Sequence, residues 1–279
     1  MNASLPIPGA AAPGAPSGAR GQSMNAIRWI GFSTILIREY GRIMRIWGQT
    51  LLPSAVTAAL YFVIFGSLIG RRIGQLGGYD YMQYIAPGLI MMSVITNSYG
   101  NVVASFFGAK FGKHIEELLV SPQPNWIIVS GYAAGGLMRG MMVGCVVTVV
   151  SLVFARLHVH HLGLIVLAVV LTSLIFSLGG FINAVFAKNF DQVNWIPTFV
   201  LTPLTYFGGV FYSISMLPPW AQALSHFNPI LHMVNAFRYG FLGTSDVSVP
   251  QAFAIMVALA VGLFALALTL MNKGVGIRE

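Results

Sequence analysis

The chain has 279 residues, of which 56% are hydrophobic and only 8% are charged. Soluble domains carry about 25% charged residues, so this composition excludes a soluble globular protein and predicts an integral membrane protein. The net charge of +8 comes from cations at the ends of apolar runs, which indicates the positive-inside rule rather than nucleic-acid binding. A single cysteine, Cys145, excludes an internal disulfide framework and a cysteine metal site.

The N-terminal region divides into a tail and a basic segment. Residues 1–24 are rich in Ala, Pro and Gly and lack the cationic start and apolar core of a signal peptide, so we expect a disordered cytosolic tail. Residues 25–49 place Arg38, Arg42 and Arg45 at helical spacing among Trp and aliphatic residues, which predicts an amphipathic helix in the membrane interface. The alternative is a merely basic segment before the first span.

Residues 50–279 contain apolar runs long enough to cross a bilayer, which takes about 20 residues. Six runs are expected to form transmembrane helices: Leu51–Gly70, Tyr84–Gly108, Ile127–Ala155, Leu162–Ala187, Trp195–Leu217 and Pro250–Met271. With both termini in the cytosol, 11 of the 15 Lys and Arg residues lie on the cytosolic side and four lie outside. The expected fold is an all-α, polytopic membrane protein with both termini cytosolic.

A charged segment separates the second and third spans. Lys110, Lys113, Glu116 and Glu117 lie close together there and must sit in water, because each charge costs about 2.5–3.5 kcal/mol in hydrocarbon. The segment is expected to be helical from Ala109 to Val120 and to end before the following prolines. Two interpretations stay open: a lever touched by a partner protein, or a loop whose charges only fix topology.

The segment between the last two spans, Pro218–Gly243, is apolar but interrupted by Pro218, Pro219 and Pro229. Two short helices that dip back into the outer leaflet fit this pattern, with their backbone polar groups buried against protein. Arg238 has no carboxylate nearby in the sequence. We therefore predict that it bonds backbone carbonyls at the end of a half-helix.

Catalytic motifs are not apparent. The run from Gly108 to His114 has three residues between its glycines instead of four and a histidine after the lysine, so it fails as a nucleotide loop. Clustered histidines such as His160 and His161 are expected to be polar caps rather than metal ligands. All seven acids lie outside the apolar runs, which argues against an ion-driven carrier. We therefore expect that the chain is not an enzyme, holds no metal and binds no cofactor.

Uncharged polar residues form faces on the second, fourth and fifth spans. The second span carries Ser93, Asn97, Asn101 and Ser105 at intervals of four residues. In the fifth span, Thr202 and Tyr206 share one side. Such faces mediate ordinary helix packing in lipid or line a substrate pathway, and both interpretations stay open.

The order of these elements resembles the membrane subunit of a type-2 ABC exporter. One matching stretch runs from Glu116 through Pro122 towards Arg139. The other includes Thr202-Pro203-Leu204, Gly208 to Tyr212, Leu217 to Trp220, Asn228-Pro229-Ile230 and Arg238. The resemblance covers nearly all of the chain after Asn25 and is closest to small bacterial inner-membrane permeases with six spans.

The resemblance implies a homodimer in which each copy binds a separate cytosolic ATPase subunit, which uses ATP and magnesium. The coupling helix would present Lys110, Lys113, His114, Glu116, Glu117 and Leu118. The pathway would include Ser93, Asn97, Asn101, Ser105, Thr202 and Tyr206, and the outer gate would include Asn228, Pro229 and Arg238. The substrate would be an amphipathic, lipid-linked, glycan-bearing or drug-like molecule. The alternatives are a facilitator or channel that works without an ATPase, and a membrane scaffold.

Overall fold

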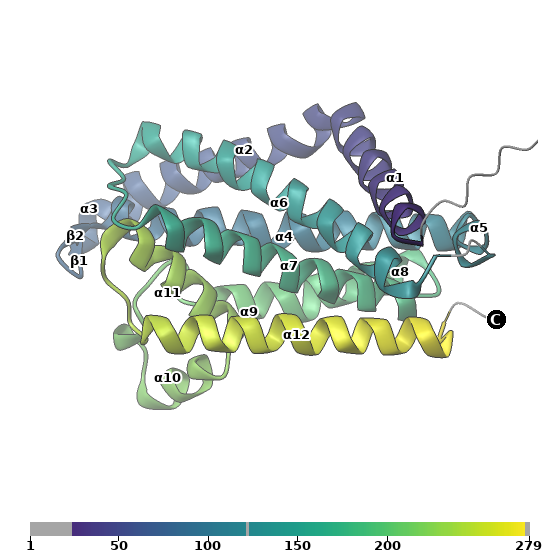
Figure 1. Ribbon diagram of the computed structural model, residues 1–279. Helices are drawn as coiled ribbons and strands as arrows, with labels where there is room; N and C mark the ends of the chain where they lie inside the picture. Colours follow the sequence, from purple (N-terminus) through teal and green to yellow (C-terminus); the bar gives the residue numbers. More distant parts are fainter. Residues whose placement is uncertain (1–23, 121–122, 277–279) are drawn as a thin grey trace, which may run out of the picture.

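The computed structural model describes residues 24–120 and 123–276. Of the tail expected at residues 1–24, residues 1–23 lie outside them, and Met24 is the first residue of a helix. The described chain is almost wholly helical, and its long helices run side by side as one bundle (Figure 1). Helix α4 (Tyr81–Phe111) is the centre of the bundle and packs against α6 (Asn125–Phe154) and α7 (Leu162–Phe186). Helix α12 (Val249–Lys273) closes the side next to α7.

Five described helices are long and apolar enough to cross a membrane: α2 (Trp47–Ile64), α4, α6, α7 and α12. Helix α2 continues through a π-helical segment, Phe65–Gly70, into the short α3 (Arg71–Ile73). A two-stranded hairpin follows, formed by β1 (Gln75–Leu76) and β2 (Tyr79–Asp80). We call this end of the bundle the hairpin end.

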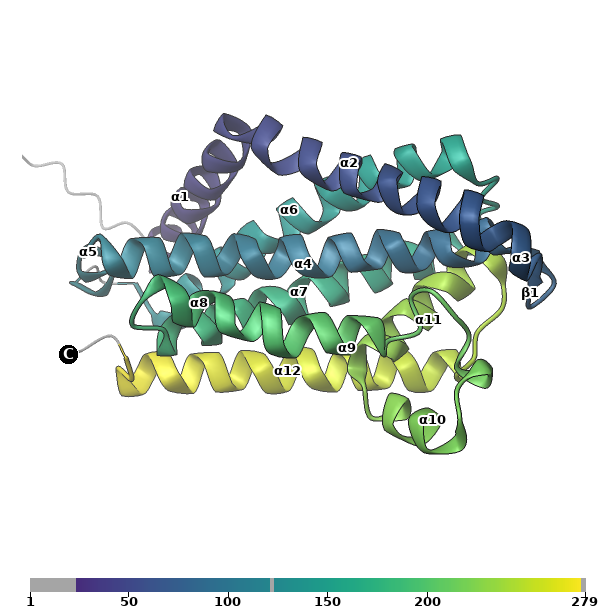
Figure 2. The same cartoon turned by 180° about the vertical axis from the view of Figure 1, so that it is seen from behind.

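The expected fifth span, Trp195–Leu217, is wrong as a single helix. Helix α8 (Phe190–Ile196), the π-helical segment Pro197–Leu201 and α9 (Thr202–Tyr206) form one continuous rod that stops at Tyr206 (Figure 2). The chain turns at Gly209, whose φ of +69° suits glycine and not a residue with a side chain. It then runs as a loop with one 3₁₀ turn, Ile214–Met216.

The interrupted segment before the last span forms two helices, as its prolines predict. Helix α10 (Pro219–His226) and helix α11 (Pro229–Leu242) each begin at a proline in the first turn, where its missing N–H costs no hydrogen bond. Helix α11 starts beside the end of α9 and rises to the hairpin end (Figure 2). It is buried along nearly its whole length.

Small residues bring α6 close to its two neighbours. A Cβ added at Gly136 would lie 2.2 Å from the Ser177 hydroxyl oxygen of α7. A Cβ at Gly140 would lie 2.0 Å from the Ser98 hydroxyl oxygen of α4. Close backbone approach through Gly and Ser is the usual way in which helices pack in lipid.

Candidate functional site

The charged segment after α4 projects from the end of the bundle opposite the hairpin (Figure 1). Helix α4 ends at Phe111, Lys113 takes a positive φ of 58°, and α5 (Ile115–Val120) begins afterwards. The expected uninterrupted helix Ala109–Val120 is therefore wrong. Lys113, His114 and Glu116 are exposed, and Ile115 anchors the segment with only 3% exposure.

The other predicted coupling residues lie apart from this exposed group or lack a described side chain. Lys110 donates from Nζ to the carbonyl oxygens of Val185 (2.8 Å) and Ala187 (2.9 Å) at the C-terminal end of α7. Lysine satisfies the last carbonyls of a helix in this way and complements its dipole. Glu117 and Leu118 belong to α5, but their side chains lie outside the described part.

Helix α1 (Met24–Arg45) lies against the bundle through the buried carboxylate of Glu39. The Glu39 side chain is 1% exposed. Its Oε2 accepts from Arg42 Nη2 at 2.8 Å and from Asn101 Nδ2 at 3.4 Å, and its Oε1 accepts from the Ser105 hydroxyl. A buried charge is tolerated only when it is paired and hydrogen-bonded, and all three partners meet this need.

Two glycines of α6 let α1 approach closely. A Cβ added at Gly131 would lie 2.7 Å from the Ile35 side chain, and one at Gly135 would lie 2.8 Å from Glu39. Arg38 completes the contact by donating to the Tyr132 hydroxyl at 2.6 Å. The segment expected at residues 25–49 is thus a helix from Met24 to Arg45, which packs on α6 and is hydrogen-bonded to α4 through Glu39. Any displacement of α1 must break charged hydrogen bonds.

The four polar residues of the second span divide into two pairs. Asn101 and Ser105 face α1 through the Glu39 network. Ser93 and Asn97 line a groove of about 210 Å³ between α2 and α4. The amide of Asn97 donates to Ser54 on α2 at 3.1 Å, so polar groups from both helices line the groove.

The two predicted residues of the fifth span are exposed on α9. The Thr202 hydroxyl bonds the Pro197 carbonyl at 2.9 Å, across the π-helical segment. The Tyr206 ring lies 5.9 Å from Phe211, whose ring is stacked at 4.6 Å on Phe65 of the first span. Tyr61, which lines the groove of Ser93 and Asn97, also contacts Phe211. These aromatic rings connect the end of α9 with the α2–α4 groove.

At the base of α11, Asn228 joins the helix start to α9. Its Oδ1 accepts from the Ile230 backbone N–H at 3.0 Å, and its Nδ2 donates to the Leu204 carbonyl at 2.6 Å. Pro229 is the first residue of α11. The turn between α10 and α11 is thus fixed to the end of α9.

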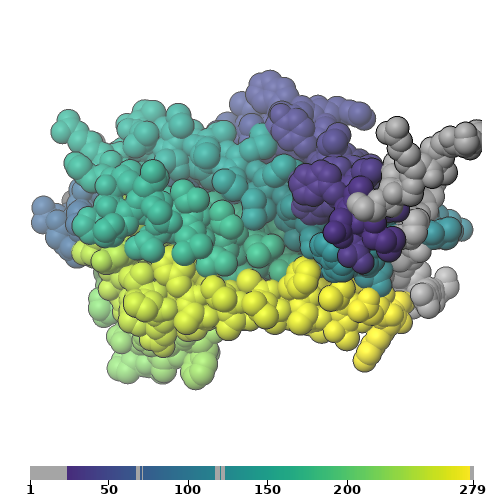
Figure 3. Space-filling view, viewed as in Figure 1, coloured from purple at the N-terminus to yellow at the C-terminus, as the bar shows by residue number. Residues whose placement is uncertain are grey.

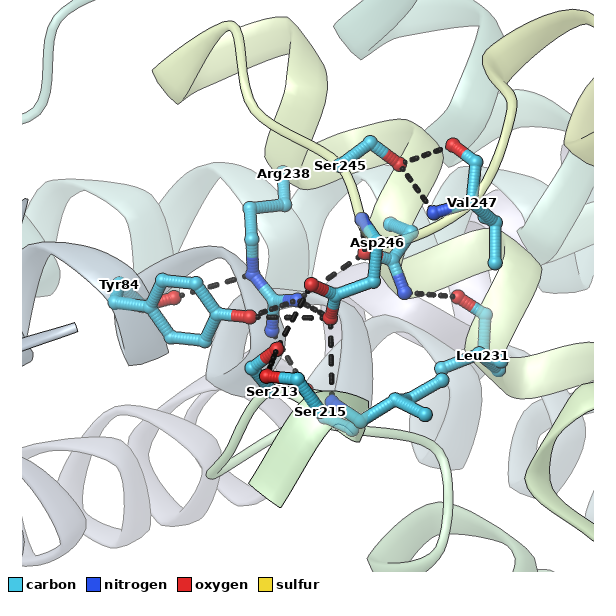
Figure 4. Close-up of polar contacts among 11 residues, drawn as sticks. Tyr84, Ser213, Ser215, Leu231, Arg238, Ser245, Asp246 and Val247 are labelled. Carbon is cyan, nitrogen blue, oxygen red and sulfur yellow. Dashed lines mark hydrogen bonds and ion pairs between the residues drawn. The ribbon is translucent and has the colours of Figure 1, made fainter. Parts of the chain in front are cut away.

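Arg238 lies near the other end of α11 and is only 1% exposed (Figure 4). It donates from Nη2 to the Gly209 carbonyl at 2.6 Å and from Nη1 to the Tyr84 hydroxyl at 3.1 Å. The expected carbonyl bond is present, but the expectation of no carboxylate is wrong. Asp246 lies 3.8 Å from Nη1, and its other oxygen accepts from Ser213 at 2.8 Å.

Comparisons with known proteins identify the family of the chain. Residues 31–242 match the model of a family described as ABC-2 type transporter. The chain is 52% identical over 256 residues to the inner membrane transport permease YadH of Escherichia coli strain K12, which covers 92% of this chain and all of that protein.

More distant relatives have the name nodulation protein J. The protein from Neorhizobium galegae is 24% identical over 70% of this chain and 74% of its own length. The protein from Rhizobium meliloti strain 1021 is 22% identical over 89% of this chain and 94% of its own length. The chain belongs to the ABC-2 type transporter family and is a multi-pass, inner-membrane transport permease subunit of the kind that works with an ABC ATPase.

Proposed function

We propose that this permease subunit exports an amphipathic substrate, whether lipid-linked, glycan-bearing or drug-like, across the inner membrane. A separate cytosolic ATPase supplies the energy from ATP and magnesium, and this chain performs no catalytic step and binds no cofactor. The observation that carries the proposal is the exposed α5 segment. Lys113, His114 and Glu116 face solvent at the end of the central helix α4, while Ile115 ties them to the core.

The geometry supports a mechanical route from α5 to the pathway. Helix α4 runs without a break from the groove at Ser93 and Asn97 to the turn before α5. It also holds α1 through the Glu39 contacts with Asn101 and Ser105. ATP binding that closes the ATPase pair would push α5 and shift α4 against α1 and α2. Transport then follows from different contacts in two states.

We further propose that two copies of the chain enclose the pathway. Helix α2 carries exposed apolar residues along its length, and Thr202 and Tyr206 are exposed on α9. A second copy facing these helices would place the polar α2–α4 groove and the aromatic residues near the dimer axis. The broken helix and the re-entrant segment would close the outer mouth.

The proposed orientation places both termini in the cytosol, since 11 of 15 Lys and Arg residues then lie inside. A cysteine at Gly163, in the first turn of α7, is expected to react with an impermeant maleimide from outside. A cysteine at Asn272, near the end of α12, should react only after the membrane is opened. Both variants need the Cys145→Ser background. Equal labelling of the two positions from outside would contradict this topology.

The functional test is whether activity depends on an ATPase. The tagged chain is expected to copurify with a nucleotide-binding subunit, and the complex in vesicles should hydrolyse ATP faster than that subunit alone. If the chain is instead a facilitator, it should be isolated without a partner subunit and should conduct solute without ATP. That result would overturn the proposed energy source.

A further inference from the structure

An apolar groove of about 390 Å³ opens between α6 and α7 near the hairpin end, on the side of the molecule seen in Figure 3. Helices α4, α6, α7 and α11 all contribute to its wall. Its residues are almost entirely apolar and include Ile90, Cys145, Val149, Val166, Phe237 and Phe241. The groove is separate from the α2–α4 groove and from the α5 surface.

The groove penetrates the bundle rather than lying on its surface. Ile90 of α4 is fully buried and Phe237 of α11 is 1% exposed, yet both line it. Gly144, Cys145 and Thr148 on α6 are small and leave the space open. At its mouth, Val149 is 65% exposed, so the groove opens where membrane hydrocarbon lies.

The chemistry of the wall selects an apolar occupant. Water needs two to four polar partners in a cavity, and this wall does not offer them. An empty groove would lose the dispersion contacts of its lining. A flexible hydrocarbon chain can adapt to the shape of the groove and restore those contacts. The surrounding bilayer supplies such chains.

The rim adds a charge preference. The connection from α6 to α7 contains Arg156, His158, His160 and His161, and all four are exposed. Val159 and Leu162 from the same stretch line the groove. A phosphodiester at the rim would therefore meet N–H donors and a fixed positive charge.

We propose that the α6–α7 groove binds one acyl chain of an anionic phospholipid, whose phosphodiester lies against Arg156 and the neighbouring histidines. The bound lipid fills a gap between four helices next to the re-entrant helix α11. It is a structural ligand and not the transported substrate, because its site does not face the proposed pathway. The inference does not depend on the identity of the exported molecule.

The test is lipid retention by the purified full-length chain, measured by native mass spectrometry after titration with phosphatidylglycerol or phosphatidylcholine. The wild type is expected to retain one phosphatidylglycerol per subunit. Cys145→Phe fills the groove from α6 and Val166→Phe fills it from α7, and each should weaken retention at least about tenfold. Displacing two methylene groups already accounts for that factor. Val261→Phe, on the exposed face of α12 away from the groove, is the matched control and should retain lipid.

Two further measurements test the headgroup contact and the acyl-chain contact separately. Arg156→Gln should reduce the preference for phosphatidylglycerol over phosphatidylcholine while a lipid is still retained. Saturating phosphatidylglycerol should slow alkylation of Cys145, the only cysteine of the chain. Equal retention by the wild type and both groove-filled variants would overturn the proposal in favour of bulk lipid. Loss of dimers without loss of lipid would instead assign the groove to a second copy.

Discussion

Replacing Arg238 with alanine is expected to destabilise the chain by about 3–5 kcal/mol, the cost of removing one partner of a buried ion pair. The guanidinium is 1% exposed and bonds three separate parts of the fold: the Gly209 carbonyl after α9, the Tyr84 hydroxyl on α4 and Asp246 after α11. Its loss removes the side-chain donor of the Gly209 carbonyl and the cation beside Asp246, which keeps only its hydrogen bonds from neutral groups such as Ser213. For a chain of this size, the melting temperature should fall by roughly 10 °C.

Thermal unfolding in detergent, followed by size-exclusion chromatography, measures this change. Arg72→Ala at the same hairpin end is the matched control, because Arg72 is exposed and such substitutions usually change stability by less than about 0.5 kcal/mol. Asp246→Asn should cost less than Arg238→Ala, since Asp246 is 24% exposed. An Arg238→Ala chain with the melting temperature of the wild type would show that the cluster does not hold the re-entrant segment.

ATPase binding should survive in the Arg238→Ala chain that remains folded. Arg238 bonds Tyr84 in the first turn of α4, which follows the hairpin. Helix α5 projects from the opposite end of the bundle (Figure 1). A folded variant that loses the ATPase would contradict the separation of the outer gate from the coupling surface.

Much of the helical layout follows from hydropathy. The expected spans 84–108, 127–155, 162–187 and 250–271 each lie within a long helix, apart from one terminal residue in two of them. The prediction of the fifth span was wrong because the apolar run continues through the Gly208-Gly209 turn. Hydropathy alone does not indicate that the chain reverses there. The positive φ at Gly209 is the local feature that ends it. The pair of adjacent glycines was the available signal.

Only part of the candidate site could be predicted from the sequence. The spacing of four residues placed Ser93, Asn97, Asn101 and Ser105 on one side of a helix, but it did not show which part of the chain packs against that side. Glu39 of α1 contacts two of these residues, Asn101 and Ser105. A lone acid between Arg38 and Arg42 looks like part of a solvated helix, and only the tertiary contact shows it to be buried.

The break between α4 and α5 has a similar cause. Residues 109–120 contain no proline and read as one helix, yet Lys113 adopts a positive φ and the chain turns. Lys110 remains on α4 and donates to the carbonyls at the end of α7, whereas Lys113 is exposed in the turn. Short helices at the end of a bundle are set by contacts such as the buried Ile115.

Reversal of Glu116 and Glu117 to lysine is expected to abolish coupling to the ATPase. Glu116 is exposed on α5, and the double change adds four units of positive charge to each subunit. Charge pairs at protein interfaces contribute roughly 1.5–7 kcal/mol when close and desolvated. Even the low end corresponds to about a tenfold loss of affinity. Membrane insertion should be normal, because α5 lies beyond the apolar helices.

ATP hydrolysis by the copurified complex is the measurement that tests the central claim most directly. The account predicts that the Glu116→Lys, Glu117→Lys chain inserts at wild-type level but neither retains the ATPase nor stimulates its hydrolysis. Asp191→Lys, an exposed acid in the first turn of α8, is the control and should keep both. A double variant that still binds and stimulates the ATPase would mean that the segment only fixes topology, and would contradict the assignment of α5 as the coupling element.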